Sequence, residues 1–384
     1  MKITMTHKFL LATVIFSFAA FNFATAQSKP WKKGIVEEEF IFNKAPFPSC
    51  HAATIAETPK GLVAAWFGGT KERNPDVEIY VSRKINHTWT KPVSVANGIQ
   101  NDTLRYSTWN PVLYQVAGGD LVLFYKIGPK PSLWKGWMIR SKDNGITWSK
   151  PERLPEDFLG PIKNKPVMLK DGSLLCPSGV ELGKTAIHFE RYNVQKNKWT
   201  MMNLPPNNAD YKSPLQPTIL FYGKDTLQAL CRSKEQAILQ TWSYDDGRTW
   251  TPLSKTSLPN NNSGIDGVTL KNGWQLLAYN HAVPNATWKN GKGPRTPLNV
   301  AISKDGETWY ASLILEDSPI SQYSYPSVIQ SKDGMVQIVY TWRRQKIKYV
   351  EVDPSKLEMI KIVNGKWPAM KGYTPPKGTT TSYD

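Results

Sequence analysis

The chain has 384 residues and a formal net charge of +17, with 48 Lys and Arg against 31 Asp and Glu. Its lysines are dispersed rather than clustered, which argues against a nucleic-acid partner and favours an anionic glycan, because a basic field concentrates acidic substrates. The three cysteines, Cys50, Cys176 and Cys231, are too few and too odd in number for a disulfide framework, so we expect buried thiols.

The amino terminus carries the pattern of a secretory signal peptide over residues 1–26. Lys2 and Lys8 precede an apolar run at 9–23, and Ala24-Thr25-Ala26 then forms a small-x-small cleavage site. A membrane anchor is the alternative, but the run is short and Asn22 interrupts it. We therefore expect export to the periplasm or the cell exterior. No other stretch approaches the length of a membrane span.

An eight-residue phrase at 141–148, Ser-Lys-Asp-Asn-Gly-Ile-Thr-Trp, recurs at 243–250 and, one residue shorter, at 303–309. Its Asp-Asn-Gly or Asp-Asp-Gly centre supplies residues that accept positive φ and hydrogen-bond their own backbone. Each copy therefore predicts a tight hairpin, with the tryptophan folding back over the turn.

The repeats predict the architecture. Decayed copies at 82–89 and 192–199 extend the series, so the tryptophans recur at 51- to 59-residue intervals, which is the length of a four-stranded blade. Short β-rich runs lie between them, at 62–67, 121–126, 173–176, 226–231, 275–279 and 336–342. We predict an all-β, six-bladed propeller over 27–367, with 35–42 completing the last blade and 368–384 as a flexible tail. A β-sandwich with chance Asp-Gly turns is the alternative.

The repeated phrase is the Asp-box, and the chain resembles the sialidase superfamily of six-bladed propellers from Trp31 to about Asp353. Sialidases hold the substrate carboxylate with three arginines and use a tyrosine nucleophile, a glutamate that assists it, and an aspartate acid/base. The resemblance implies that Arg232 and Arg295 are the second and third arginines, Tyr325 the nucleophile and Asp76 the acid/base. Asp-boxes lie on the outer rim, so they indicate fold rather than function.

Two positions depart from the sialidase pattern. The first arginine, in an Arg-Ile-Pro phrase, is missing, and the segment 45–51 that ends in His51 stands in its place. The assisting glutamate is replaced by Gln216, and an amide cannot accept a proton as a carboxylate can. Ordinary sialidase chemistry is therefore not expected.

The remaining residues suit a reaction that needs no nucleophile. Arg232 and Arg295 still describe a carboxylate clamp, because guanidinium forks match carboxylates bidentately. Next to a uronate carboxylate, removal of the C5 proton and loss of the C4 substituent requires a base, an acid and donors for the enolate-like intermediate. Tyr325 is a suitable base, and His51 could serve as the partner acid or as a donor to the carboxylate, a role that His188 or His281 could take instead.

Further basic residues predict a funnel that holds a second acidic group such as sulfate: Arg105, Lys126, Lys163 and Lys165. Trp109 and Trp134 could stack on sugar rings. The histidines lack metal-binding spacing, so we expect no metal and no cofactor.

Three hypotheses follow from the sequence. The first is a lyase or dehydratase that forms a 4,5-unsaturated uronate at the non-reducing end of an anionic oligosaccharide or polysaccharide, a chemistry similar to that of ulvan-type uronate lyases with propeller folds. The second is a sialidase-like exo-glycosidase with Asp76 as the acid. The third is a non-catalytic glycan-binding propeller.

Overall fold

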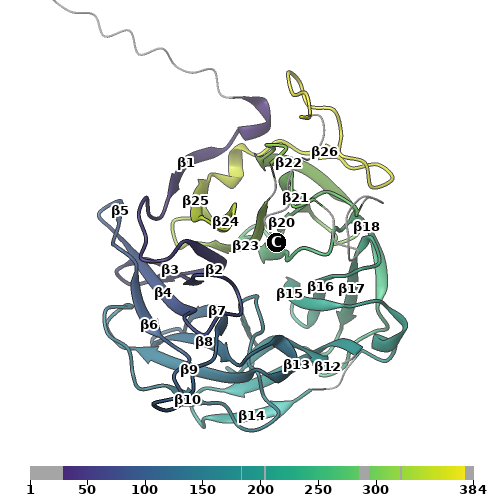
Figure 1. The fold of residues 1–384 in the computed structure, drawn as a ribbon. Coiled ribbons are helices and arrows are strands. Elements are labelled where there is room, and N and C mark those ends of the chain that lie inside the picture. Colours follow the sequence, from purple (N-terminus) through teal and green to yellow (C-terminus); the bar gives the residue numbers. More distant parts are fainter. Residues whose placement is uncertain (1–28, 183, 203–204, 285–293, 321, 377–384) are drawn as a thin grey trace, which may run out of the picture.

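A computed structural model describes residues 29–182, 184–202, 205–284, 294–320 and 322–376. In these ranges the chain forms antiparallel strands and short 3-10 turns, and its strands make six sheets around a common centre (Figure 1). No helix in the described ranges has the length and apolar character to cross a membrane. The predicted signal peptide at 1–26 lies outside these ranges.

Each sheet is one blade, and the blades follow each other along the chain. The first blade contains β2 (Ser49–Thr58), β3 (Gly61–Gly69), β4 (Glu78–Ile85), β5 (Thr88–Trp89) and β6 (Val93–Ala96). The second contains β7 (Thr108–Gln115), β8 (Leu121–Ile127), β9 (Lys135–Ser141) and β10 (Glu152–Arg153). The third contains β11 (Val167–Met168), β12 (Leu174–Leu182), β13 (Lys184–Asn193) and β14 (Lys198–Met201). The fourth contains β15 (Leu215–Tyr222), β16 (Thr226–Arg232), β17 (Ala237–Ser243) and β18 (Ser254–Pro259). The fifth contains β19 (Asp266–Thr269), β20 (Gln275–Tyr279), β21 (Leu298–Ser303), β22 (Trp309–Glu316) and β26 (Ile360–Lys361).

The sixth blade closes the ring with a strand from the other end of the chain. It has the order β1 (Ile35–Phe40), β25 (Lys346–Val352), β24 (Val336–Trp342) and β23 (Tyr323–Gln330). Phe40 of β1 packs edge-on against Trp342, with ring centroids 5.2 Å apart. Lys84 of the first blade reaches Glu37 of β1 at 2.6 Å. The predicted six-bladed propeller, closed by this segment, is confirmed.

The core lies between neighbouring blades, because both faces of most sheets are covered. β8 is buried along its whole length, which explains why residues 121–125 read as a continuous apolar run rather than an alternating one. One apolar cluster fills the space between the second and third blades and includes Phe124, Tyr192 and Trp199. Cys50, Cys176 and Cys231 are free and buried in such clusters, as expected.

The Asp-boxes form the predicted hairpins and also join neighbouring blades. The Ser243 hydroxyl accepts the Gly247 N–H at 2.9 Å, and Asp245 accepts the Thr249 N–H at 2.8 Å, so the turn is closed by its own side chains. Gly247 has a φ of +78°, and a Cβ there would lie 2.7 Å from Leu175 in the preceding blade. Glycine is therefore needed for both the turn and the close contact.

The innermost strands of four blades begin with a β-bulge. Pairing shifts register after His51 in β2, Trp109 in β7, Leu215 in β15 and Ser324 in β23. The bulges contain Ala52, Asn110, Gln216 and Tyr325, each with a positive φ between 31° and 57°. In three of them a proline follows, which suits a position that makes no ladder hydrogen bond. These four strands surround the centre of the ring in Figure 1.

Candidate active site

A cavity of about 460 Å³ opens over the bulged ends of the inner strands. It brings together five residues expected to form the site, namely His51, Gln216, Arg232, Arg295 and Tyr325. Trp109 and Trp134, which could stack on sugar rings, also line it. The other lining residues were not expected in the site from the sequence: Ser49, Lys71, Glu72, Arg73, Asn110, Pro131, Glu181 and Arg344.

Tyr325 lines the cavity, and its hydroxyl oxygen accepts hydrogen bonds from neighbouring side chains. Arg232 donates to the Tyr325 hydroxyl at 2.5 Å, and the Gln216 amide nitrogen is 3.4 Å from the same oxygen. The guanidinium carbons of Arg232 and Arg295 lie 5.6 and 5.5 Å from the tyrosine ring centroid. The Tyr325 oxygen is therefore held as a hydrogen-bond acceptor.

Gln216 is oriented by the same arginine. Its amide oxygen accepts a hydrogen bond from Arg232 at 3.2 Å, so its amide nitrogen faces the Tyr325 hydroxyl. A carboxylate at this position would take a proton from the tyrosine, whereas the amide can only donate to it.

His51 lies against Tyr325, with the rings tilted by 46° and their centroids 4.2 Å apart, and its Nδ1 lies 2.9 Å from the Thr341 hydroxyl. Burial holds the pKa of His51 well below its usual value, and the positive charges of Arg344, Arg295, Arg232 and Lys163 lower that pKa further. The imidazole is therefore neutral near pH 7, so it carries no extra proton for the acid role expected from the sequence.

A third guanidinium reaches the cavity from an unexpected strand. Arg344 follows β24 of the sixth blade, and its carbonyl accepts the Cys50 N–H at 2.8 Å, beside the segment where the family's first arginine is missing. Its side chain pairs with Glu72. The sequence could have indicated Arg344, because it follows the second strand of its blade, and Arg232 also lies at the end of the second strand of its own blade.

Glu181 places a carboxyl group at the cavity wall and was not expected there from the sequence. It lies near the end of β12, and burial raises its pKa, an effect that the charge of Arg232 opposes. A partly buried carboxyl with a raised pKa holds its proton longer and can act as a general acid.

Asp76 and Arg105 lie outside the cavity lining. The Asp76 carboxylate accepts hydrogen bonds from the Thr70 N–H at 2.7 Å and the Thr70 hydroxyl at 2.9 Å, which close its loop. Arg105 pairs with Glu78 at 2.6 Å. Both side chains are therefore engaged by their own loop and strand rather than by the central site.

The three lysines expected to form a basic funnel are instead buried or paired below the cavity. Lys126 donates to the Pro161 carbonyl, and burial lowers its pKa to about 7. Lys165 pairs with Asp266 at 3.0 Å. The basic part of the lining comes from Lys71, Arg73 and the three arginines.

The other two histidines also have structural partners outside the cavity lining. The Nε2 of His188 is 2.9 Å from Glu190, which in turn accepts the Gly160 N–H at 2.7 Å. His281 lies between the Tyr279 hydroxyl at 2.6 Å and the Gly365 carbonyl at 2.9 Å. Among the described residues, no three His, Cys, Asp or Glu side chains gather as a metal-binding group.

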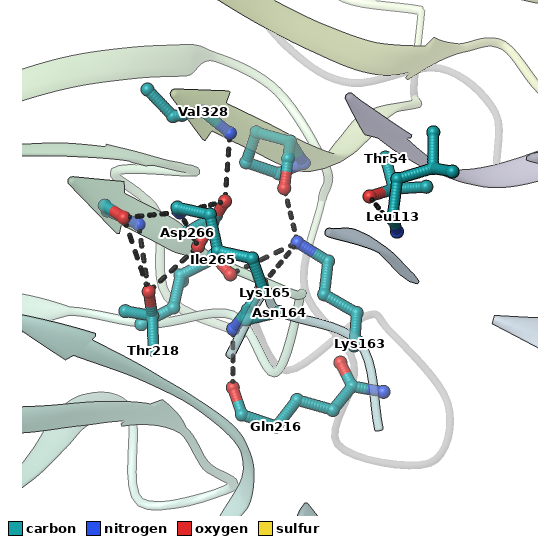
Figure 2. A network of polar contacts seen from close by, with 12 residues as sticks. Thr54, Leu113, Lys163, Asn164, Lys165, Gln216, Thr218, Ile265, Asp266 and Val328 are labelled. Carbon is teal, nitrogen blue, oxygen red and sulfur yellow. Dashed lines mark hydrogen bonds and ion pairs between the residues drawn. The ribbon is translucent and has the colours of Figure 1, made fainter. Parts of the chain in front are cut away.

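A buried polar network supports the bulges from below (Figure 2). Lys163 donates to the carbonyls of Pro326 and Ile265 and to Asn164, while burial lowers its pKa to about 7. Asn164 donates to the carbonyls of Gln216 at 2.9 Å and Pro217 at 3.0 Å. The third blade therefore holds the backbone of the Tyr325 and Gln216 bulges.

Asp266 connects the rest of this network, which we call the central network (residues 163–165, 218 and 266). Its carboxylate, which is fully buried, accepts from the Thr218 hydroxyl at 2.7 Å and the Val328 N–H at 2.8 Å, in addition to Lys165. A buried carboxylate with this many donors is compensated within the fold, so we assign it a structural role.

Comparisons with known proteins agree with this fold. The family model described as "BNR repeat-like domain" matches residues 60–338. None of the curated proteins matches the sequence. Among solved structures, a protein of unknown function from Dyadobacter fermentans is similar, with a TM-score of 0.68 and 16% identity over 84% of this chain and 99% of that one.

Two sialidase structures are also similar in fold. The intramolecular trans-sialidase from Ruminococcus gnavus has a TM-score of 0.64 and 14% identity, over 84% of this chain and 99% of that one. The NanB sialidase from Streptococcus pneumoniae has a TM-score of 0.63 and 11% identity, over 86% of this chain and 72% of that one. The chain therefore belongs to the BNR repeat-like family and folds as a sialidase-like six-bladed propeller.

Proposed function

We propose that this chain is an exported carbohydrate-active enzyme that carries out β-elimination at a uronate of an anionic oligosaccharide, such as an ulvan-type fragment. The catalytic unit would be the propeller over 27–367, released from the leader at 1–26. One observation carries the proposal. The side chains that hydrogen-bond to the Tyr325 hydroxyl, Arg232 and Gln216, both donate to it, so the oxygen is held as an acceptor, as a group that takes up the C5 proton would be.

The substrate carboxylate would bind between Arg232, Arg295 and Arg344. All three line the cavity. Three guanidinium groups would also stabilise the second negative charge that develops on the carboxylate when the C5 proton leaves. A strongly basic lining suits an anionic sugar for the same reason.

In the elimination, one proton would leave C5 and one would be delivered to the departing oxygen. The Tyr325 phenolate takes the proton from C5, and the electrons of the C–H bond form the C4–C5 double bond. The C4–O bond breaks, and the departing oxygen takes a proton from a general acid. Loss of water from a terminal uronate makes the enzyme a dehydratase, whereas loss of a sugar linked to O4 makes it a lyase.

His51 would take part as a neutral hydrogen-bonding group beside Tyr325. Its lowered pKa makes the imidazole too weak a base to take the proton from the phenol. With its ring centroid 4.2 Å from that of Tyr325, His51 would contact the same part of the substrate.

An exo-glycosidase is the second candidate, and Glu181 favours it. A carboxyl whose pKa is raised by burial is the acid that glycosidases use to protonate a leaving oxygen. In this case water would attack the sugar, and the product would carry no double bond.

The products separate the two candidates. Incubation with oligosaccharides that contain a uronate at or next to the non-reducing end should generate ultraviolet absorbance from the conjugated carbon–carbon double bond. Tyr325→Phe should lower this rate about 10²- to 10⁴-fold without loss of folded structure. New reducing ends without ultraviolet absorbance would instead establish hydrolysis, and binding without any product would establish a non-catalytic glycan-binding propeller.

A further inference from the structure

A second cavity of about 330 Å³ lies directly beside the active-site cavity. The two share the residues of one wall, Pro131, Trp134 and Glu181. The volume is at the lower end of the range for ligand cavities, roughly 300–1,000 Å³, which suits a single sugar ring. We call it the side cavity.

The lining of the side cavity differs chemically from that of the active site. Leu133, Leu154, Phe158, Leu159 and Val180 give it an apolar surface. Trp134 is buried and held edge-on by Trp109, with ring centroids 5.9 Å apart, so the indole forms a rigid partition. Apolar and aromatic walls of this kind contact the C–H face of a sugar ring.

The charges around the side cavity are close to balanced. Lys135 and Arg153 share Glu156, the latter at 2.5 Å, and Asp157 adds a second carboxylate to the lining. The guanidinium groups that would bind a second anion lie in the active-site cavity instead. The side cavity therefore suits a neutral sugar rather than a sulfated or carboxylated one.

We infer that the side cavity binds a neutral sugar linked to O4 of the reacting uronate, and that Glu181 protonates the oxygen between the two rings. The inference rests on the proposed function and makes the enzyme a lyase, since the leaving group is a sugar and not water. Glu181 borders both cavities, and the bond that breaks must cross the same boundary. The Glu181 carboxyl, whose pKa is raised by burial, supplies the proton. The proton passes from the carboxyl to the departing oxygen, which leaves as a sugar hydroxyl.

The side cavity can be tested with two substrates that differ only at O4. One carries a neutral sugar on O4 of the uronate, and the other carries a methyl group, which leaves the side cavity empty. We expect kcat/KM to be about 10- to 100-fold higher for the sugar-bearing substrate, because binding of the leaving ring contributes to the transition state.

Leu133→Trp fills the side cavity from an exposed position that does not line the active site. It should abolish the preference for the sugar-bearing substrate and leave the methylated one unchanged. Ile146→Trp, on the exposed Asp-box hairpin, is the matched control and should change neither value. Equal kcat/KM for the two substrates in the wild-type enzyme, or an equal effect of Leu133→Trp on both, would overturn the inference.

The role of Glu181 is tested with a leaving group that needs no proton. Glu181→Gln should lower kcat/KM about 10²- to 10⁴-fold for the sugar-bearing substrate. With a 4-fluoro analogue, which expels fluoride, the loss should be less than about tenfold, since no general acid is required. The same loss with both substrates would show that Glu181 has no part in proton transfer.

Failure of the proposed function would be recognised separately. If the wild-type protein eliminates neither substrate, calorimetric titration with both compounds still tests the side cavity. At least about tenfold tighter binding of the sugar-bearing compound, lost in Leu133→Trp, would support the side cavity as a sugar site without elimination. Equal affinity for the two compounds would overturn it.

Discussion

At the residue scale, the charge state of His51 is the most consequential feature of the site. Four cationic side chains act on this histidine, and together with burial they keep the imidazole neutral. The folded protein therefore binds fewer protons at this position than the unfolded chain does in mild acid.

We predict that His51 makes the protein less stable in acid. Its pKa is lower in the folded than in the unfolded state, so its contribution is fully present above about pH 6.5, the usual histidine value, and is lost as the pH falls from there towards the folded pKa. In that window His51 should add up to about 1.4 kcal/mol per pH unit to the pH dependence of unfolding. Denaturant titrations of the wild type and His51→Gln between pH 8 and pH 5 would measure it; parallel curves for the two proteins would contradict the prediction.

Gln216→Glu distinguishes the two chemistries at the position where the family's glutamate is missing. The new carboxylate would attract Arg232 and repel a phenolate on Tyr325. We expect the rate of elimination to fall about 10²-fold or more, since Tyr325 would no longer act as an anionic base. Assays of ultraviolet absorbance and of reducing ends on the same samples would show this. A rise in hydrolysis would favour the exo-glycosidase. Gln216→Ala, which adds no charge, is the control.

Several site residues could be predicted from the sequence, and others could not. Register relative to the Asp-boxes identified Tyr325, Arg232 and Gln216, because propeller blades repeat along the chain. Arg344 and Glu181 belong to positions that the family pattern leaves open, and their approach depends on how strand ends converge. Asp76 was expected from the resemblance alone, whereas its carboxylate is occupied by Thr70.

At the element scale, the bulges decide which side chains enter the cavity. Each adds a residue with positive φ at the beginning of an inner strand, which turns a side chain away from the sheet. Such backbone conformations cost about 1–3 kcal/mol each and persist only where the surroundings hold them. Lys163 and Asn164 provide that support for the Tyr325 and Gln216 bulges.

We predict that Asn164→Ala lowers kcat about 10- to 100-fold, because the bulge that presents Gln216 loses two hydrogen bonds and shifts. It should also cost about 1–3 kcal/mol of stability, since two buried carbonyls lose their donor. Asn208→Ala is the control, because Asn208 is also buried and donates to the Ile187 carbonyl at 2.7 Å, but it lies away from the bulges. Steady-state kinetics and thermal unfolding should show equal destabilisation with a loss of kcat in Asn164→Ala alone.

The hairpins were predictable and the bulges were not. An Asp-box contains its own hydrogen-bond partners, so eight residues are enough to specify the turn. A bulge depends on the strand it pairs with and on the network beneath it. The repeated x-Pro at Asn110-Pro111, Gln216-Pro217 and Tyr325-Pro326 was the local signal for it.

At the scale of the whole molecule, the net charge of +17 should act on substrate encounter. The Debye length falls from about 30 Å at 0.01 M salt to about 8 Å at 0.15 M, so long-range attraction of an anionic oligosaccharide is screened. We predict that kcat/KM for a uronate oligosaccharide decreases severalfold over this range, while thermal stability changes little. Kinetics in a neutral salt series would measure it. Constant kcat/KM would mean that the charge plays no part in substrate capture.

The ring itself was accessible from the sequence because its blades repeat at regular intervals. The segment beyond the last blade has no repeat to indicate its course. Its composition suggests a flexible tail over 368–384, yet Met370 is buried against the fifth blade, and Tyr373 packs against Trp31 with ring centroids 5.0 Å apart. Apolar residues among prolines and glycines were the only indication of this packing.

That contact between Trp31 and Tyr373 has a consequence for connectivity. The chain returns to its starting point after one circuit, so the order of the blades along the polypeptide is not required by their packing. A short peptide joining the two ends near these aromatic residues would allow the chain to be opened elsewhere, for example at Gly118-Gly119 between β7 and β8. Gly118 has open space around it, and the turn is exposed. The propeller should thus accept circular permutation with its site intact, and its blades can be treated as a cyclic rather than a linear sequence.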